Sequence, residues 1–325
     1  MAALAGCIWW ASRQEAPTFP TTATSLAEIG AALGLYAVIT TVRGWRWHRI
    51  LLWTGADHRG VDAYGLTVVG YMGNTVLPAR GGEVLRILLL SERSSVRRRE
   101  ALGTVLPERL LDATALVLLF AIVSFMGTAG TPTGTAPAAS GLAVLLVGTV
   151  ALVTYLRLRI AGRFERFAER VRPIARASRL LLTWTGVSLL AVSILVWLAE
   201  ATVFWLVLRS LSIEVSGPEA LLIVLLASFF ALVPAAPGYV GTFDAALLFG
   251  LRAAGVAGGG AVGAALLYRF VVFVPITAAG LLLMLVRYGG LGRLRARNRS
   301  LPDPVLAGPA RSQRRPHTPH GERRI

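Results

Sequence analysis

This chain contains no lysine, so all 33 of its basic side chains are arginines. Without lysine it cannot form the G-x-x-x-x-G-K-[ST] loop that holds nucleotide phosphates, which excludes that class of nucleotide-driven protein. A single cysteine, Cys7, excludes an intramolecular disulfide, and the four histidines show no zinc-ligand spacing. We therefore expect neither a metal ion nor any other cofactor.

Charged residues are also scarce, at 15% of the chain against about 25% in soluble domains. Hydrophobic residues make up 55% of the 325 residues, and the mean hydropathy is +0.63. This composition excludes an ordinary soluble domain and predicts a membrane protein. We attribute the net charge of +16 to arginines held at an anionic membrane surface, and we expect no binding to nucleic acid.

A helix needs about 20 mostly apolar residues to cross a bilayer. Five runs come close to this length: Leu26–Val42, Ala113–Gly127, Ser140–Leu156, Gly186–Leu208 and Gly263–Val286. We interpret the shorter apolar segment Ala2–Ala11 either as the end of a first span or as a tilted, thinly inserted helix. The sequence therefore predicts an all-α, polytopic integral membrane protein with about six full spans.

Two further apolar stretches, Val61–Leu90 and Pro218–Leu251, are interrupted by residues that break helices. The interrupting residues are Gly73, Pro78, Gly81 and Gly82 in the first stretch and Pro234, Pro237, Gly238 and Gly241 in the second. Proline removes a backbone donor and glycine weakens a helix, so neither stretch is typical of one continuous helix.

Arginine placement predicts the topology, because cytoplasmic loops carry an excess of arginine. The arginine-rich segments are residues 43–49, 93–99 and 157–179 and the tail from residue 287, whereas residues 128–139 and 211–219 contain no arginine. The first group is expected in the cytoplasm and the second outside. We accordingly expect a multi-pass protein of the bacterial cytoplasmic membrane with its C-terminus in the cytoplasm.

The number of membrane crossings places all arginine-rich segments in the cytoplasm only if each of the two interrupted stretches turns back within the membrane. We predict that Val61–Leu90 enters from the cytoplasm, turns near Pro78–Gly82 and returns, while Pro218–Leu251 does the same from outside. Two re-entrant hairpins of opposite orientation point to a binding site near the bilayer midplane, as in transporters. The alternative is two proline-kinked ordinary spans that violate the charge rule once.

Residues 1–290 are expected to form one transmembrane domain. Within it, residues 157–179 place apolar side chains among eight arginines at helical spacing, which predicts an amphipathic helix on the cytoplasmic membrane surface or a plain linker helix. Residues 291–325 are rich in arginine, proline and glycine, and we expect a disordered basic cytoplasmic tail.

Ionisable residues within apolar segments are costly and mark candidate functional sites. Eight lie in or beside such segments: Arg80, Glu83, Arg86, Glu108, Arg109, Asp112, Asp244 and Arg269. Glu83 and Arg86 are three residues apart, and Glu108 and Asp112 share a helix face, with Pro107 expected in the first turn of that helix. The alternative is that these groups form balanced pairs that only fix helix register.

The turns themselves are candidate headgroup sites. The turn at Arg80–Gly82 precedes a half-helix whose free N–H groups could hold a phosphate, and the Arg80 guanidinium could add two hydrogen bonds. The second turn, Pro237–Gly241, has the same features before the helix that carries Asp244. The carboxylates could hold a cationic amine or carry a coupling proton, and the residues alone favour neither role.

Four segments resemble one known family. Residues 73–86, GNTVLPARGGEVLR, resemble the N-x-x-x-P-x-R-x-G-E-x-x-R block of the lysylphosphatidylglycerol synthase transmembrane-region family, also described as flippase-like membrane proteins. Residues 108–112 are similar to its ER-x-x-D element. Residues 234–244 are similar to its P-x-x-P-G-x-x-G-x-x-E element, with Asp244 in place of glutamate, and Arg269 matches a basic residue of its last helix.

The resemblance implies translocation of lipids between leaflets, with substrates that range from aminoacylated phospholipids to polyprenyl-linked or hopanoid lipids. The soluble aminoacyl-transferring domain of the full-length synthases has no counterpart in this sequence, so we do not carry lipid aminoacylation over. The candidate substrate-binding residues are Asn74, Pro78, Arg80, Glu83, Arg86, Glu108, Arg109, Asp112, Pro237, Gly238, Gly241, Asp244 and Arg269.

We therefore expect a lipid flippase without catalytic residues, whose partners are membrane lipids with anionic or aminoacylated headgroups. Two alternatives remain open. One is a non-transporting accessory of a lipid synthase or glycosyltransferase. The other is a membrane-embedded transferase that uses the Glu108 and Asp112 pair.

Overall fold

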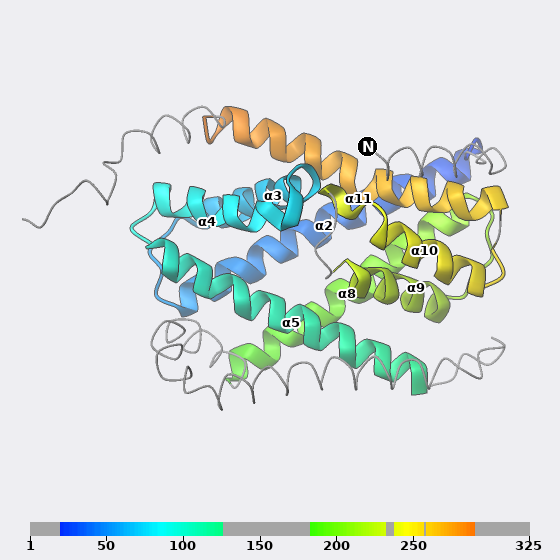
Figure 1. The fold of residues 1–325 in the computed structure, drawn as a ribbon, viewed down its shortest axis with the longest axis horizontal. Helices are drawn as coiled ribbons and strands as arrows, with labels where there is room; N and C mark the ends of the chain where they lie inside the picture. The colour runs from blue at the N-terminus through cyan, green and yellow to red at the C-terminus, as the bar shows by residue number, and fades with distance from the viewer. Residues whose placement is uncertain (1–19, 126–182, 232–236, 257, 290–325) are drawn as a thin grey trace, which may run out of the picture. The chain divides into compact units, whose positions relative to one another are not determined.

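The structure, a computed structural model, describes residues 20–125, 183–231, 237–256 and 258–289 (Figure 1). Every regular element within these residues is helical, which confirms the all-α prediction. They are α2 (Ala23–Trp53), α3 (Gly60–Val76), η1 (Pro78–Arg80), α4 (Gly81–Arg93), α5 (Arg98–Phe125), α8 (Trp184–Ser210), α9 (Gly217–Phe230), η3 (Pro237–Tyr239), α10 (Thr242–Ala253) and α11 (Gly258–Val286). The chain divides into residues 1–283 and residues 284–325, and all contacts described below lie within the first unit.

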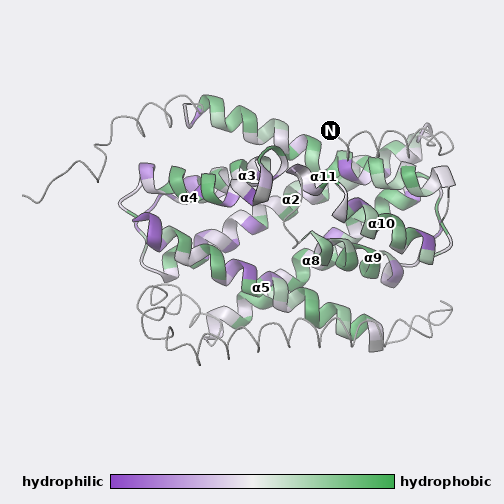
Figure 2. Ribbon diagram, in the orientation of Figure 1, coloured by the Kyte–Doolittle hydropathy of each residue, from purple (hydrophilic) through white to green (hydrophobic). Residues whose placement is uncertain are grey.

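Three of these helices, α2, α8 and α11, are long and apolar enough to cross a membrane, so the protein is membrane-embedded. Hydrophilic residues interrupt the middle of α5, whereas most helix surfaces are hydrophobic (Figure 2). Several predicted segments lie outside the described residues: Ala2–Ala11, Ser140–Leu156, the basic segment 157–179 and the tail 291–325.

The first interrupted stretch is a helical hairpin, as predicted. Helix α3 ends before Leu77, whose backbone is extended, and the short η1 turn begins at Pro78, which has no N–H to continue the helix. Helix α4 then returns along α3 (Figure 1). The two backbones touch at Gly82, where a Cβ atom would collide with the Gly70 carbonyl oxygen and the Asn74 amide nitrogen. Glycine is required there because the helices pack backbone to backbone.

The second interrupted stretch also folds into a hairpin. Ser216 and Glu219 form a capping box at the start of α9, and α10 returns beside it, with Gly250 directly against Ile223. The turn contains η3 and Gly241 at φ 97°, a conformation that favours glycine. The Pro234 part of the predicted turn lies outside the described residues.

The tips of the two hairpins meet. Arg80 in the first tip donates a 2.7 Å hydrogen bond to the Ala231 carbonyl at the end of α9, and Gly238 in the second tip lies against Thr75 of α3. The helices of the hairpins extend from this meeting point in opposite directions (Figure 1). This arrangement is the one expected of hairpins that enter a membrane from opposite sides, and entry itself remains a prediction.

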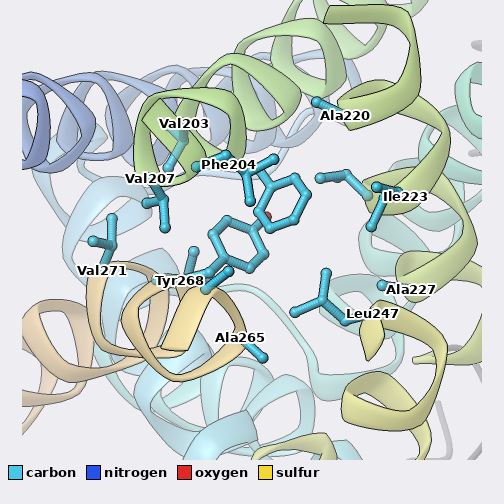
Figure 3. Packing of buried hydrophobic residues seen from close by; sticks show 14 of the residues in the cluster. Val203, Phe204, Val207, Ala220, Ile223, Ala227, Leu247, Ala265, Tyr268 and Val271 are labelled. Atoms are coloured by element: carbon cyan, nitrogen blue, oxygen red, sulfur yellow. The ribbon is translucent and has the colours of Figure 1, made fainter. Parts of the chain in front are cut away.

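A hydrophobic core joins the second hairpin to α8 and α11. Phe204 of α8 packs edge-on against Tyr268 of α11, with ring centroids 4.9 Å apart, and Leu247 and Ala265 lie in the same cluster (Figure 3). Tyr268 also stacks on Phe243 of α10. The core thereby fixes the face of α11 that carries the site residues.

Two predicted helix boundaries were wrong. Helix α5 begins at Arg98 and not near Pro107, so Pro107 lies well inside the helix and not in its first turn. Helix α2 continues to Trp53 and contains Arg43 and Arg46, which were predicted to lie in a cytoplasmic loop. In both cases the charged residues were taken to end an apolar span, but they pair inside the protein and the helix continues through them.

Substitution of Gly82 by alanine should destabilise the protein, because its Cβ has no room between α3 and α4. We expect a loss of about 1–3 kcal/mol in the free energy of unfolding, as for other overpacked cores. Gly34 of α2 is the control, since a Cβ there meets nothing within 4 Å. Thermal unfolding in detergent should show a lower midpoint for Gly82→Ala than for the unmodified protein, whereas the midpoint of Gly34→Ala should not be lowered. Equal midpoints for both variants would contradict the backbone contact.

Candidate functional site

A buried ion pair between α2 and α5 lies at the centre of the charged region. Arg46, fully buried, donates to both carboxylate oxygens of Asp112 at 2.6 and 3.0 Å, and to the Ser193 hydroxyl at 2.6 Å. A planar guanidinium matches a carboxylate in this two-bond geometry, which strengthens the pair and fixes its orientation. The pair therefore ties α2, α5 and α8 together in one register.

A second buried pair joins α4 to α5. Arg86 lies 2.7 Å from the Glu108 carboxylate, and its guanidinium carbon is 4.2 Å from the centroid of the Trp47 ring. Glu108 is fully buried and Arg86 is 3% exposed. We expected Arg86 to pair within its own helix with Glu83, but the closer partner is on α5.

Two further pairs complete the set. Arg109 of α5 lies 3.0 Å from Glu83 of α4, and Arg43 of α2 lies 2.9 Å from Glu200 of α8. The other carboxylate oxygen of Glu200 accepts a 3.4 Å hydrogen bond from the Tyr268 hydroxyl. Each of these carboxylates thus has an arginine partner on a different helix.

Arg80 is the surplus cation of this cluster. It lies 3.7 Å from Glu83, which is closer to Arg109, and its other strong contact is the neutral Ala231 carbonyl. Its guanidinium also lies 5.6 Å from the centroid of the Tyr239 ring. Counting Arg43, Arg46, Arg80, Arg86 and Arg109 against Glu83, Glu108, Asp112 and Glu200, the cluster carries one excess positive charge.

The backbone of Arg80 is strained. Its φ of 56° and ψ of 37° lie in the left-handed region, which costs a non-glycine residue about 1–2 kcal/mol. The residue follows Pro78 in the turn and immediately precedes Gly81. An arginine in a position that favours glycine indicates that its side chain is needed at the tip.

A cavity of about 140 Å³ lies where the two tips meet. Four of the predicted site residues line it: Asn74, Arg80, Arg109 and Asp112. Five of the lining residues carry a buried side-chain atom with no hydrogen bond among the described residues: Oδ1 of Asn74, Nε1 of Trp197 and the Nε atoms of Arg43, Arg80 and Arg109. These atoms leave hydrogen-bonding capacity at the cavity that a polar ligand can use.

The other predicted residues take different places. Pro78 begins the first turn, Pro237 and Gly238 form the second, and Gly241 precedes α10. Glu83 does not line the cavity itself, but it forms an ion pair with Arg109, which does. Arg86 and Glu108 form a pair that does not line it, which is the purely structural role considered as the alternative above.

Asp244 and Arg269 form a clamp at the second tip. Arg269 lies 2.6 Å from Asp244 and donates a 2.8 Å hydrogen bond to the Gly238 carbonyl. Asp244 in turn accepts a 3.1 Å hydrogen bond from the Gly241 amide. The first turn of α10 therefore already has an anionic partner, and its N-terminus does not match the expected free phosphate site.

Sequence reasoning missed several residues that line the cavity: Arg43, Glu200, Tyr239 and Tyr268. It also missed Arg46, the buried partner of Asp112. Glu200 could have been found, because it is the only acidic residue in the apolar stretch Gly186–Leu208. Arg43 and Arg46 lay next to an apolar run and were counted as loop arginines.

The carboxylates of the cluster are not arranged as a metal-binding site in the part of the chain that the structure describes. Within the described ranges, no group of three or more histidine, cysteine, aspartate or glutamate side chains is placed to hold a metal ion. The nearest partners of the four central carboxylates are arginines. The chemistry that the cavity offers is therefore binding of an anion or a polar group by guanidinium donors.

Comparisons with known proteins show which family the chain is similar to. The family model described as the lysylphosphatidylglycerol synthase TM region matches residues 1–280. A UPF0104 membrane protein of Methanothermobacter thermautotrophicus is 26% identical, covering 78% of this chain and 81% of that protein. A phosphatidylglycerol lysyltransferase of Staphylococcus haemolyticus is 36% identical over 124 residues, and one of Staphylococcus epidermidis is 33% identical over 114 residues. These matches cover only 14% and 13% of the two lysyltransferases.

Replacement of Asp112 by asparagine should destabilise the protein by about 3 kcal/mol or more, because it leaves the buried Arg46 charge without its main partner. Thermal unfolding in detergent measures the effect. Glu100→Gln is the matched control: it removes one charge from the same helix, but its pair with Arg97 is exposed. No measurable change is expected there. Equal effects of the two variants would contradict a structural role for the buried pair.

Proposed function

Because the chain belongs to the family of lysylphosphatidylglycerol synthase transmembrane regions, we propose that it moves a lipid with a polar headgroup between the leaflets of a bacterial cytoplasmic membrane. The headgroup passes through the cavity between the hairpin tips. The substrate class is a lipid with an anionic phosphate, such as an aminoacylated phospholipid or a polyprenyl-linked or hopanoid lipid. The C-terminus lies in the cytoplasm.

The excess positive charge at the cavity carries this proposal. A lipid phosphodiester has one negative charge, and one arginine of the cluster, Arg80, shares its carboxylate partner Glu83 with the closer Arg109. An anionic headgroup would neutralise the cluster, in which Arg80 and Arg109 share the single carboxylate of Glu83. An excess positive charge is expensive in a membrane interior unless a ligand or water compensates it.

The contact between Arg80 and Ala231 suggests how binding opens the path. The same guanidinium that would hold the phosphate also ties the first tip to the end of α9. A phosphate that accepts from Arg80 competes with the Ala231 carbonyl and releases this tie between hairpins. Headgroup binding thereby favours separation of the tips, which a cavity of about 140 Å³ requires before a whole headgroup can pass.

Transport is favoured over an enzymatic reaction, because the carboxylates that a transferase would use are held by arginines. Glu108 is bound to Arg86 and Asp112 to Arg46, so the carboxylate oxygens that a transferase would use already have guanidinium partners. Lysyl transfer belongs to the named relatives, of which this chain matches a small part. The lipid headgroup is thus carried and not modified.

Substitution of Arg80 by alanine should abolish protein-dependent exchange of anionic lipids between leaflets while the protein remains folded. Arg80→Lys keeps the charge but loses the planar fork, and we expect at least a tenfold slower exchange. The measurement is leaflet exchange of headgroup-labelled lipids in proteoliposomes, with thermal unfolding as the folding check. The matched control is Arg99→Ala, which removes an exposed arginine at the start of α5.

Two outcomes would contradict the proposal. Undiminished exchange in Arg80→Ala would remove the headgroup role of this arginine. No exchange of any tested lipid by the unmodified protein, with or without a proton gradient, would favour a non-transporting accessory that binds lipid for a neighbouring synthase.

A further inference from the structure

A second hollow, separate from the central cavity, lies between α10 and the first half of α11. Its volume is about 550 Å³, and apolar side chains such as Leu248, Phe249, Val262 and Leu266 line its length. Phe249 is 68% exposed and Leu266 is 50% exposed, so the hollow is an open groove on the surface of the helices. Ala245, an exposed small residue, leaves room between the two helices.

The polar side chains of this groove lie at its two ends. The Asp244–Arg269 pair closes the end next to the hairpin tip, and Arg252, at the C-terminal end of α10, lies at the other. Arg252 is exposed and has no ion pair within the described part of the chain. A groove that is apolar along its length and cationic at its outer end matches an acyl chain that ends in an anionic headgroup.

The length of the groove fits one leaflet. Asp244 and Arg252 are eight residues apart on α10, which corresponds to about 12 Å along the helix axis. Half of the hydrocarbon core of a bilayer is about 15 Å thick. With the tip near the midplane, Arg252 is therefore placed close to the level of the headgroups in one leaflet.

We propose that this groove binds one anionic phospholipid of the membrane, with an acyl chain along α10 and α11 and its phosphate on Arg252. The groove and the central cavity are lined by different residues of the same two helices: Phe243 and Tyr268 line the cavity, whereas Leu248 and Leu266 line the groove. The Asp244–Arg269 clamp separates the two. This is a second lipid site, and its occupancy does not depend on transport.

The test is cross-linking with phosphatidylglycerol and phosphatidylcholine that carry the same photoactivatable acyl chain, in nanodiscs that hold the full chain. Mass spectrometry of the peptides locates the modified residues. We expect phosphatidylglycerol to label the groove residues of α10 and α11 several-fold more than phosphatidylcholine does. Labelling of Leu248 and Leu266, which do not line the central cavity, identifies the groove itself.

Two variants separate the tail from the headgroup. Ala245→Phe fills the groove and should reduce its labelling by about tenfold for both lipids, whereas Ala278→Phe, at an exposed alanine of α11 outside the groove, should not. Arg252→Gln, at an exposed position that leaves the fold intact, should remove the preference for phosphatidylglycerol and leave labelling by phosphatidylcholine unchanged.

Equal labelling by both lipids in the unmodified protein would overturn the proposal, since bulk lipid would then fill the groove. Undiminished labelling in Ala245→Phe would do the same. The outcome is independent of the central site, because Arg80→Ala should block leaflet exchange and leave the groove labelling as it is.

Discussion

The pairing of buried arginines with carboxylates on neighbouring helices is the interaction on which the rest of this structure depends. An unpaired charge in a membrane interior is so costly that each pair must form for the helices to pack at all. Every pair joins two different helices, so the pairs also fix register. The pairs are Arg46–Asp112, Arg86–Glu108, Arg109–Glu83 and Arg43–Glu200.

The sequence predicted the two hairpins and the polar region between them because both rest on local chemistry. Proline disfavours a continuous helix and glycine permits a sharp turn, and Pro78 and Pro237, each close to glycines, marked the breaks at the correct places. An ionisable residue in an apolar segment is visible without a structure, and Glu108 and Asp112 were identified in this way. The all-α membrane class followed from composition alone.

The partners could not be predicted, because pairing across helices depends on how helices far apart in sequence are placed. Spacing within one helix suggested Glu83 with Arg86, whereas each has its closer partner on α5. Arg43 and Arg46 were assigned to a loop for the same reason, whereas both are buried in α2 and paired with carboxylates of α8 and α5. The start of α5 was misplaced since Glu108 and Asp112 were assumed to mark its beginning.

The close backbone contact at Gly82 makes the two hairpins mechanically different, although their sequences have similar breaks. The first hairpin has little freedom between its helices, because carbonyl and amide groups of α3 lie directly against α4, and any displacement carries both helices together. The tip of the second is held to its surroundings by side-chain contacts from Arg80 and Arg269, which another hydrogen-bond acceptor can replace. One hairpin is therefore fixed in its internal geometry, whereas the contacts of the other hairpin's tip can be exchanged without breaking a backbone contact.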